Sequence, residues 1–299
     1  MQSEIYLRWR LRAAGYGDHE VRRMLRDGSL HPIRRGAYVA GPSEDPAVGH
    51  ALLVRAALAE LSPDAVVSHV SAAVLHGLRV WGIPLDRVIV TRTRRRSGAR
   101  RGSRVHVHCA PMEPDEIVLV DGLPVTSVPR TIVDVARTVG FEQAVVVADA
   151  ALEAGLVDEG ALAVALARWS RWPGLPAARR AIGFAARGSG SVGESRSRVA
   201  IAEAGLPAPI LQWEVRRSDG TFVGRVDFGW PRQRTVGEFD GRVKYGKLLR
   251  PGQDPADVVY EEKRREDALR AEDLAVVRWT WPDLTHFAPV AARLRSRLT

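Results

Sequence analysis

The sequence is poor in cysteine and in long apolar runs. Its 299 residues contain one cysteine, Cys109, which excludes an intramolecular disulfide framework and a cysteine-based zinc cluster. No apolar run approaches the roughly eighteen residues that a membrane span requires. The opening MQSEIYLRWRLRAAG lacks the apolar segment and cleavage site of a signal peptide. We therefore expect a cytoplasmic protein without a membrane partner, in which oxygen or histidine ligands would hold any metal ion.

Lysine is rare in this chain, and acidic residues are outnumbered by basic ones. The three lysines, Lys244, Lys247 and Lys263, lie within one stretch of twenty residues. A genome that favours arginine codons could leave this pattern, and so could a need for the compact ammonium of lysine, whose pKa is readily adjusted. The chain carries 44 Lys+Arg against 35 Asp+Glu, a formal net charge of +9. This excess favours a polyanionic partner such as nucleic acid.

The length and apolar content allow several domains. The chain is 45% hydrophobic, which suffices for two or three ordinary cores. We divide it into residues 1–42, 43–186 and 187–299, and the Gly/Ser-rich stretch at 187–193 is the clearest boundary. Because helical and strand patterns both occur, we expect a multidomain α+β protein.

The first part is small and basic. EIYLRWRLRAAG predicts a helix ended by Gly15, and DHEVRRMLRDG predicts a second helix with Asp18 as N-cap and Gly28 at its C-terminus. SLHPIRRGAYVA predicts a hairpin with its turn at Arg35-Gly36. Two helices and a basic hairpin indicate a winged helix-turn-helix, unless the charges form an ordinary solvated face. The arginines that would contact DNA are Arg22, Arg23, Arg26, Arg34 and Arg35.

A second basic segment lies further along the chain. RTRRRSGARRGSR, residues 92–104, contains seven arginines and no acid. A run of this kind repels itself and is commonly a solvated loop. Near a DNA-binding domain it could instead track phosphates, and we assign that role to Arg94, Arg95 and Arg96.

Periodicity in the middle part predicts helices near residues 46–61, 69–77, 129–138 and 141–154, and strands near 86–92, 104–109 and 117–125. His69 and His76 fall on one face of a predicted helix. Without an acid or a cysteine at ligand spacing, they are better explained as packing or capping residues than as metal ligands. The middle part has no assignable chemistry of its own.

The last part predicts the element order α-β-β-β-α-β. A helix, GESRSRVAIAEAG, ends at Gly205, and two strands, ILQWEVRRS and TFVGRVDFGW, are joined by a turn at Asp219-Gly220. A third strand, RTVGEFD, is followed by the helix ADVVYEEKRREDALRAE and by a final strand, LAVVRWTW.

Four carboxylates fall at corresponding places in this order. Glu194 is on the first helix, Asp227 is in the second strand, and Glu238 and Asp240 alternate onto one face of the third. Such a group repels itself unless a cation sits within it, so we expect Asp227, Glu238 and Asp240 to bind Mg²⁺ or Mn²⁺. Asp227 and Glu238 carry the argument because both stand among apolar strand residues. Taken alone, Glu194 is explained as a helix-dipole charge and Asp240 as a turn residue.

The first and middle parts resemble the AbiEi-type antitoxins. HPIRRGAYV at residues 31–39 is similar to the wing of their winged-helix domain. SHVSAAVLHGL at 68–78 and VTSVPRTIVDVAR at 125–137 look like segments that follow that domain in the family. The resemblance implies a DNA-binding regulator with a cognate toxin protein as partner.

Residues 190–299 resemble the PD-(D/E)XK nuclease superfamily, and within it the bacterial domains similar to the very-short-patch-repair endonuclease. The matching positions are Glu194, Asp227 and Glu238. EKRRED at 262–267 opens the helix that follows, and VVRWTWPDL closes the domain. The resemblance implies a restriction-endonuclease-like fold and metal-dependent hydrolysis of phosphodiesters.

The chain departs from that superfamily at one catalytic position. Asp240 stands where many of these enzymes carry a lysine that orients the attacking water or stabilises the phosphate. Related repair endonucleases also lack this lysine, so another group could replace it. Lys244 is our first candidate and Lys263 our second.

These patterns favour a DNA-binding protein with a metal-dependent endonuclease-like domain that acts in defence or repair. The alternative is an AbiEi-like antitoxin or transcriptional regulator whose nuclease-like domain is inactive and serves binding or dimerisation. A purely structural α/β module is a third interpretation. DNA is the expected partner in the first two cases, and a toxin protein and a second copy of the chain are further candidates.

Overall fold

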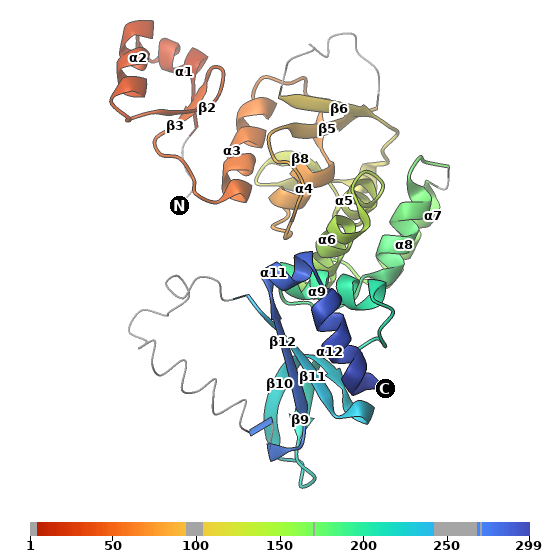
Figure 1. Cartoon of the computed structure of the whole chain (residues 1–299). Coiled ribbons are helices and arrows are strands. Elements are labelled where there is room, and N and C mark those ends of the chain that lie inside the picture. Colours follow the sequence, from red (N-terminus) through yellow and green to blue (C-terminus); the bar gives the residue numbers. More distant parts are fainter. Residues whose placement is uncertain (1–4, 94–103, 170, 242–267, 270) are drawn as a thin grey trace. The chain divides into compact units, whose positions relative to one another are not determined.

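The computed structural model describes residues 5–93, 104–169, 171–241, 268–269 and 271–299, which form a mixed α+β chain with three sheets. The chain divides into two compact units, drawn from red to blue along the sequence in Figure 1. The first unit comprises Met1–Val147 and Leu156–Gly183, and the second comprises Ala148–Gly155 and Phe184–Thr299.

The first unit opens with a small sheet and two helices. Its elements are β1 (Ile5–Leu7), α1 (Arg8–Ala13), α2 (Asp18–Arg26), β2 (His31–Arg34) and β3 (Ala37–Val39). The strands are antiparallel in the order β1-β3-β2. The helices cover a core that contains Leu11, Val21, Leu30 and Tyr38.

Two details of this region were predicted wrongly. Residues 5–7 form β1 instead of the first helical turn, because they pair with Ala37–Val39, and this tertiary pairing overrides local helix preference. Asp18 is not the N-cap of α2. Gly17 holds that position, and its N–H donates to Glu20 at 2.8 Å. The turn at Arg35-Gly36 is confirmed, with Gly36 at a φ of +80°.

A five-stranded sheet forms the centre of the first unit. Its strands are β4 (Val66–Val67), β5 (Val88–Arg92), β6 (Val105–Cys109), β7 (Ile117–Val120) and β8 (Leu123–Thr126), in the order β6-β5-β4-β8-β7. The helices of this unit that accompany the sheet are α3 (Pro46–Leu58), α4 (His69–Leu75), α5 (Val128–Ala136) and α7 (Glu159–Arg168). Two more helices, α6 (Phe141–Glu153) and α8 (Leu175–Phe184), reach the boundary between the units.

The predicted strand at residues 117–125 is a hairpin of β7 and β8. Asp121 and Gly122 separate the two strands at φ values of +49° and +77°, and Asp-Gly is a favoured dipeptide for such a turn. The four helices predicted in the middle part are present, with ends that differ from the prediction by one to three residues where they differ, whereas β4 and α7 were not predicted. The two residues of β4 are too few to show a periodicity.

A buried ionic network ties α5 to its surroundings. Arg130 is 2% exposed, and its guanidinium donates to Glu116 and Asp134, both at 2.8 Å. Trp169, just after α7, donates its indole N–H to the other oxygen of Glu116 at 2.8 Å. The guanidinium of Arg130 also lies 4.3 Å from the ring centre of Trp172. Because its charges are paired and shielded from water, the network is sensitive to the loss of any member.

The second unit contains a four-stranded mixed sheet. Its elements are α9 (Val192–Glu203), β9 (Ile210–Arg216), β10 (Phe222–Trp230), β11 (Thr235–Asp240), β12 (Ala275–Thr280), α11 (Trp281–Thr285) and α12 (Ala288–Leu298). The strand order is β12-β11-β10-β9, and β12 is parallel to β11, while the other neighbours are antiparallel. The helix predicted at 256–272 falls almost entirely outside the described residues. The helices α11 and α12 were not predicted.

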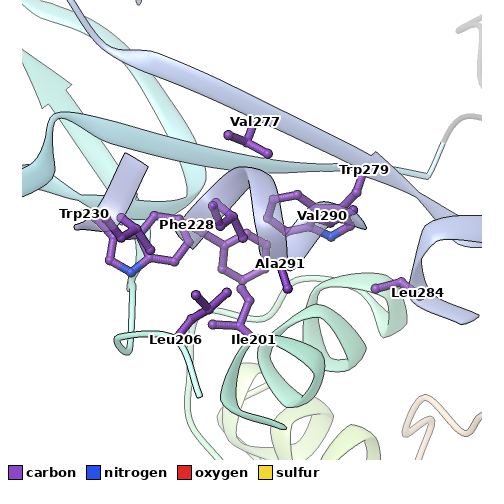
Figure 2. Close-up of a cluster of buried hydrophobic side chains, with 11 residues drawn as sticks. Ile201, Leu206, Phe228, Trp230, Val277, Trp279, Leu284, Val290 and Ala291 are labelled. Atoms are coloured by element: carbon purple, nitrogen blue, oxygen red, sulfur yellow. The ribbon is translucent and has the colours of Figure 1, made fainter. Parts of the chain in front are cut away.

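The main core of this unit lies between the sheet and its helices (Figure 2). Phe228 of β10 stacks on Trp279 of β12 with ring centres 5.3 Å apart, and Ile201 of α9 and Val290 of α12 belong to the same cluster. The indole N–H of Trp279 donates to Ser197 of α9 at 2.7 Å, so the buried ring has a polar partner.

The start of α9 packs tightly against the end of β11. A Cβ atom at Gly193 would lie 1.9 Å from the ring of Phe239, so this approach requires glycine. The contact fixes the N-terminus of α9 beside the strand that carries Glu238 and Asp240.

None of the helices in the described part of the chain combines the length and the apolar character needed to cross a membrane.

Candidate functional site

Asp227 and Glu238 lie next to each other on the two central strands of the second unit. The antiparallel ladder pairs Phe228 of β10 with Gly237 of β11, and one step further along it brings Asp227 beside Glu238. Asp227 accepts a hydrogen bond from the backbone N–H of Phe239 at 2.9 Å. Its carboxylate therefore takes a backbone donor of β11 immediately after Glu238.

Glu238 is almost fully buried and is paired with a cation. It is 6% exposed, and its Oε2 accepts from Nε of Arg278 at 2.8 Å. Arg278 is the residue opposite Glu238 in the parallel pairing of β11 with β12, and about a third of its side chain is exposed. The charge of a buried carboxylate needs a partner of this kind, or a metal ion.

Asp240 ends β11 and is half-buried. It is two residues from Glu238, so the alternation of the strand directs both side chains to the same side. Its pairing partner in β12 is Thr280. Asp240 is thus a third acid on this side of the sheet.

Glu194 is occupied by hydrogen bonds at the start of α9. Its Oε2 accepts from the backbone N–H of Gly190 at 2.8 Å and from the side-chain amide of Gln212 at 2.9 Å. Its Oε1 accepts from the hydroxyl of Ser191, the N-cap residue, at 2.7 Å. These contacts give Glu194 a structural role in the first turn of α9, which is the simpler of its two interpretations.

Arg278 and Gln212 are site residues that the sequence reasoning missed. Arg278 stands in VVRWTW, a charge among apolar strand residues, which is the same signal that identified Asp227 and Glu238. Gln212 has a φ of +49°, an unusual value for a residue other than glycine, and its amide binds Glu194. No pattern in the sequence indicates that backbone conformation.

The predicted metal site has two adjacent carboxylates as its core. Mg²⁺ commonly takes one or two protein carboxylates and completes its shell with water and substrate phosphate, so Asp227 and Glu238 fit this ion or Mn²⁺. Among the described residues, no three histidine, cysteine or acidic side chains form a group that could hold a metal ion. Lys244 and Lys263 lie outside the described residues.

The arginines predicted to bind DNA differ in their surroundings. Arg22, Arg23, Arg26 and Arg35 are exposed. Arg34 is instead half-buried, and it pairs with Glu60 at 2.5 Å and donates to the carbonyl of Ala56 at 3.2 Å. Arg34 therefore fastens β2 to α3 and its following turn. Arg94, Arg95 and Arg96 lie outside the described residues.

The last residue of the basic stretch 92–104 contacts the hairpin of the first unit. Arg104, its last residue, donates to the carbonyl of Ile33 in β2 at 3.0 Å. Ile33 is two residues from Arg35, at the tip of the hairpin. This bond holds Arg104 against strand β2 of the hairpin.

His76 is the C-cap residue of α4, and its Nε2–H donates to the carbonyl of Thr126 in β8 at 2.7 Å, so its ring joins the helix to the strand. His69 begins α4 at a φ of +54° and is 3% exposed.

No family model matches the chain. Two curated relatives from Mycobacterium tuberculosis are similar to it: the uncharacterized protein MT2308 of strain CDC 1551 / Oshkosh and the uncharacterized protein Rv2248 of strain H37Rv. Each is 29% identical over 169 residues, which cover 52% of this chain and 62% of the relative. The chain thus spans less than two thirds of the length of either relative.

Proposed function

We propose that the chain is a DNA-binding protein with a metal-dependent endonuclease domain, which hydrolyses phosphodiesters in the cytoplasm. The adjacent carboxylates of Asp227 and Glu238 on the central strands β10 and β11 carry this proposal. The order α9, β9, β10, β11 and β12, with the last strand parallel to β11, supports a restriction-endonuclease-like domain. The exposed arginines of α2 and of the β2–β3 turn support a winged helix that holds DNA.

In the proposed reaction the metal ion, the acids and the nearby cations have different roles. When bound, Mg²⁺ or Mn²⁺ would lower the pKa of a water molecule and polarise a phosphate oxygen. Asp227 and Glu238 would hold the ion, and Asp240 would add negative charge beside them. Arg278, which pairs with Glu238, joins Lys244 as a candidate to stabilise the developing charge of the phosphate.

Neutral replacements of the two central acids test this function. Asp227→Asn and Glu238→Gln keep the size of the side chain and remove the charge that holds a divalent ion. Each should abolish Mn²⁺-dependent nicking of supercoiled DNA, while DNA affinity stays the same or rises because repulsion of the phosphates falls. Glu214→Gln is the matched control, since Glu214 is an exposed acid on β9 of the same sheet. Nicking at parental rates in both site variants would show that the acids are not catalytic.

An AbiEi-like antitoxin or regulator with an inactive nuclease-like domain is the second candidate. Two contacts favour it: Arg278 already compensates Glu238, and the capping turn already uses the carboxylate of Glu194. These acids could then serve the fold alone, with DNA, a toxin protein or a second copy as partners. Calorimetry separates the candidates. A wild-type protein that binds DNA but takes up no Mn²⁺, with or without DNA, would favour the regulator.

A further inference from the structure

The first unit contains a cavity of about 730 Å³ beside its five-stranded sheet. Ile83, Pro84 and Val139 contribute apolar walls, and three histidines, His69, His106 and His108, also line it. Cavities of this volume are typical of small-molecule sites, which combine apolar walls with a few polar groups. The lining includes neither the acids of the second unit nor the buried ionic network around Arg130.

The three histidines form a column of parallel rings. His69 and His108 stack with ring centres 4.0 Å apart and planes 16° from parallel, and His108 and His106 stack at 4.4 Å and 6°. His106 and His108 are alternate residues of β6, and His69 begins α4. The column closes at buried His69 and opens at His106, whose side chain is exposed.

His69 carries a polar atom that the fold does not satisfy. Its Nε2 is buried and has no hydrogen-bond partner in the described part of the chain. Buried His50 provides the contrast, because one of its ring nitrogens binds the carbonyl of Leu85 and the other binds Ser71, each at 2.8 Å. Leaving a buried polar group unsatisfied costs free energy, and this atom is also inaccessible to a molecule in the cavity.

Ser68 contacts the other ring nitrogen of His69. The hydroxyl of Ser68 accepts from Thr91 at 2.8 Å and lies 3.0 Å from Nδ1 of His69. Because a hydroxyl can accept two hydrogen bonds as well as donate one, both tautomers of His69 fit this contact.

Burial favours the neutral form of two rings of the stack. It lowers the pKa of His69 to about 3, and nearby Asp134 opposes this effect only in part. Burial also lowers the pKa of His108. The stacked imidazoles present flat π surfaces, and the nitrogens of parallel rings do not point toward one common position as the ligands of a metal ion must.

We propose that this cavity binds a planar nitrogen heterocycle of nucleobase size, which stacks on the exposed ring of His106 at the open end of the histidine column. The base comes either from a free nucleoside or from an unpaired position in a nucleic-acid strand. The proposal is independent of phosphodiester hydrolysis, because the cavity lies in the first unit and the acids lie in the second.

Fluorescence of 2-aminopurine tests the proposal directly, because the probe is quenched when it stacks. The full-length protein is titrated into the 2-aminopurine nucleoside, into a single-stranded oligonucleotide that carries one 2-aminopurine, and into that oligonucleotide with the probe paired in a duplex. We expect saturable quenching of at least one unpaired probe, which identifies the source of the base, and little quenching of the duplex. Absence of saturable quenching with both unpaired probes would overturn the proposal.

Variants of the column distinguish stacking from general binding. His106→Ala removes the exposed outer ring and should weaken the affinity about tenfold or more, whereas His106→Phe keeps a flat ring and should stay within about threefold. Thr138→Phe places a bulky group at an exposed position of the lining and should also weaken binding without altering the column. His19→Ala, at an exposed residue of α2, is the control. Equal affinities in all four variants, or stoichiometric Zn²⁺ uptake that depends on His69, would overturn the proposal.

Discussion

A buried imidazole shows how strongly one residue depends on its surroundings. His69 would titrate near pH 6.5 in an unfolded chain, but burial lowers its folded pKa to about 3. Arg130 and Arg137 lower this pKa further, and the carboxylate of Asp134 raises it. Between about pH 6.5 and pH 3, His69 is therefore protonated in the unfolded chain but neutral in the folded chain. The contribution of neutral His69 to the free energy of unfolding is complete above pH 6.5, and it is lost as the pH falls toward 3.

The low pKa of His69 predicts that the stability of the fold depends on pH. When the pH falls from 7 to 5, protonation of His69 in the unfolded chain should lower the free energy of unfolding by about 2 kcal/mol. His69→Asn keeps a polar side chain that tolerates the positive φ, and it removes the titration. We expect the variant to be less stable at pH 7 but to lose less stability on acidification, as measured by urea unfolding at several pH values. His19→Asn should follow the wild type. Parallel curves for His69→Asn and the wild type would contradict the assignment.

At the scale of elements, residues with a strong local signal were predicted well and residues that depend on distant partners were not. Gly36 identified the hairpin turn because positive φ favours glycine. Residues 5–7 carry no sign of their partners in β3, which lie 30 to 34 positions further along the chain, and so were assigned to a helix. In the site, Asp227 and Glu238 were recognisable as acids in apolar strands. The pairing of Glu238 with Arg278 depends on the parallel register of β12, which the sequence does not reveal.

The network around α5 predicts an unequal effect of two arginine substitutions. Arg130→Met leaves the carboxylates of Glu116 and Asp134 buried without their shared cation, so it should lower the free energy of unfolding by about 3–5 kcal/mol. Arg168→Met, which removes the more exposed pair with Asp115, should cost at most about 1 kcal/mol. Chemical denaturation followed by circular dichroism measures both.

A double substitution checks the cause of that loss. Glu116→Gln removes one of the buried charges that Arg130→Met leaves uncompensated, so the double variant should be less destabilised than the sum of the two single variants. Strict additivity would show that the two side chains do not interact energetically, and that packing against Trp172 accounts for the loss.

At the scale of the whole molecule, the positive charge and the acidic pair are compatible. A net charge of +9 attracts a polyanion over long distances, whereas Asp227 and Glu238 act only over a few ångströms, where Arg278 or a metal ion compensates them. The arginines that can meet phosphates are those without strong partners inside the fold. The pairing of Arg34 with Glu60 therefore distinguishes it from its neighbour Arg35, although the two are adjacent in the sequence.

This difference predicts opposite outcomes for two neighbouring substitutions. If the hairpin contacts DNA, log affinity should fall with log salt concentration at about −0.9 per neutralised phosphate. Arg35→Gln should reduce the magnitude of that slope by about one, because the exposed cation would lose its phosphate. Arg34→Gln should weaken the attachment of β2 to α3 and leave the slope nearly unchanged, since its charge is already paired. Fluorescence anisotropy with a labelled duplex, measured from low to moderate salt, gives both slopes. Equal changes for the two variants, or a wild-type affinity that does not respond to salt, would remove the hairpin from the DNA-binding surface.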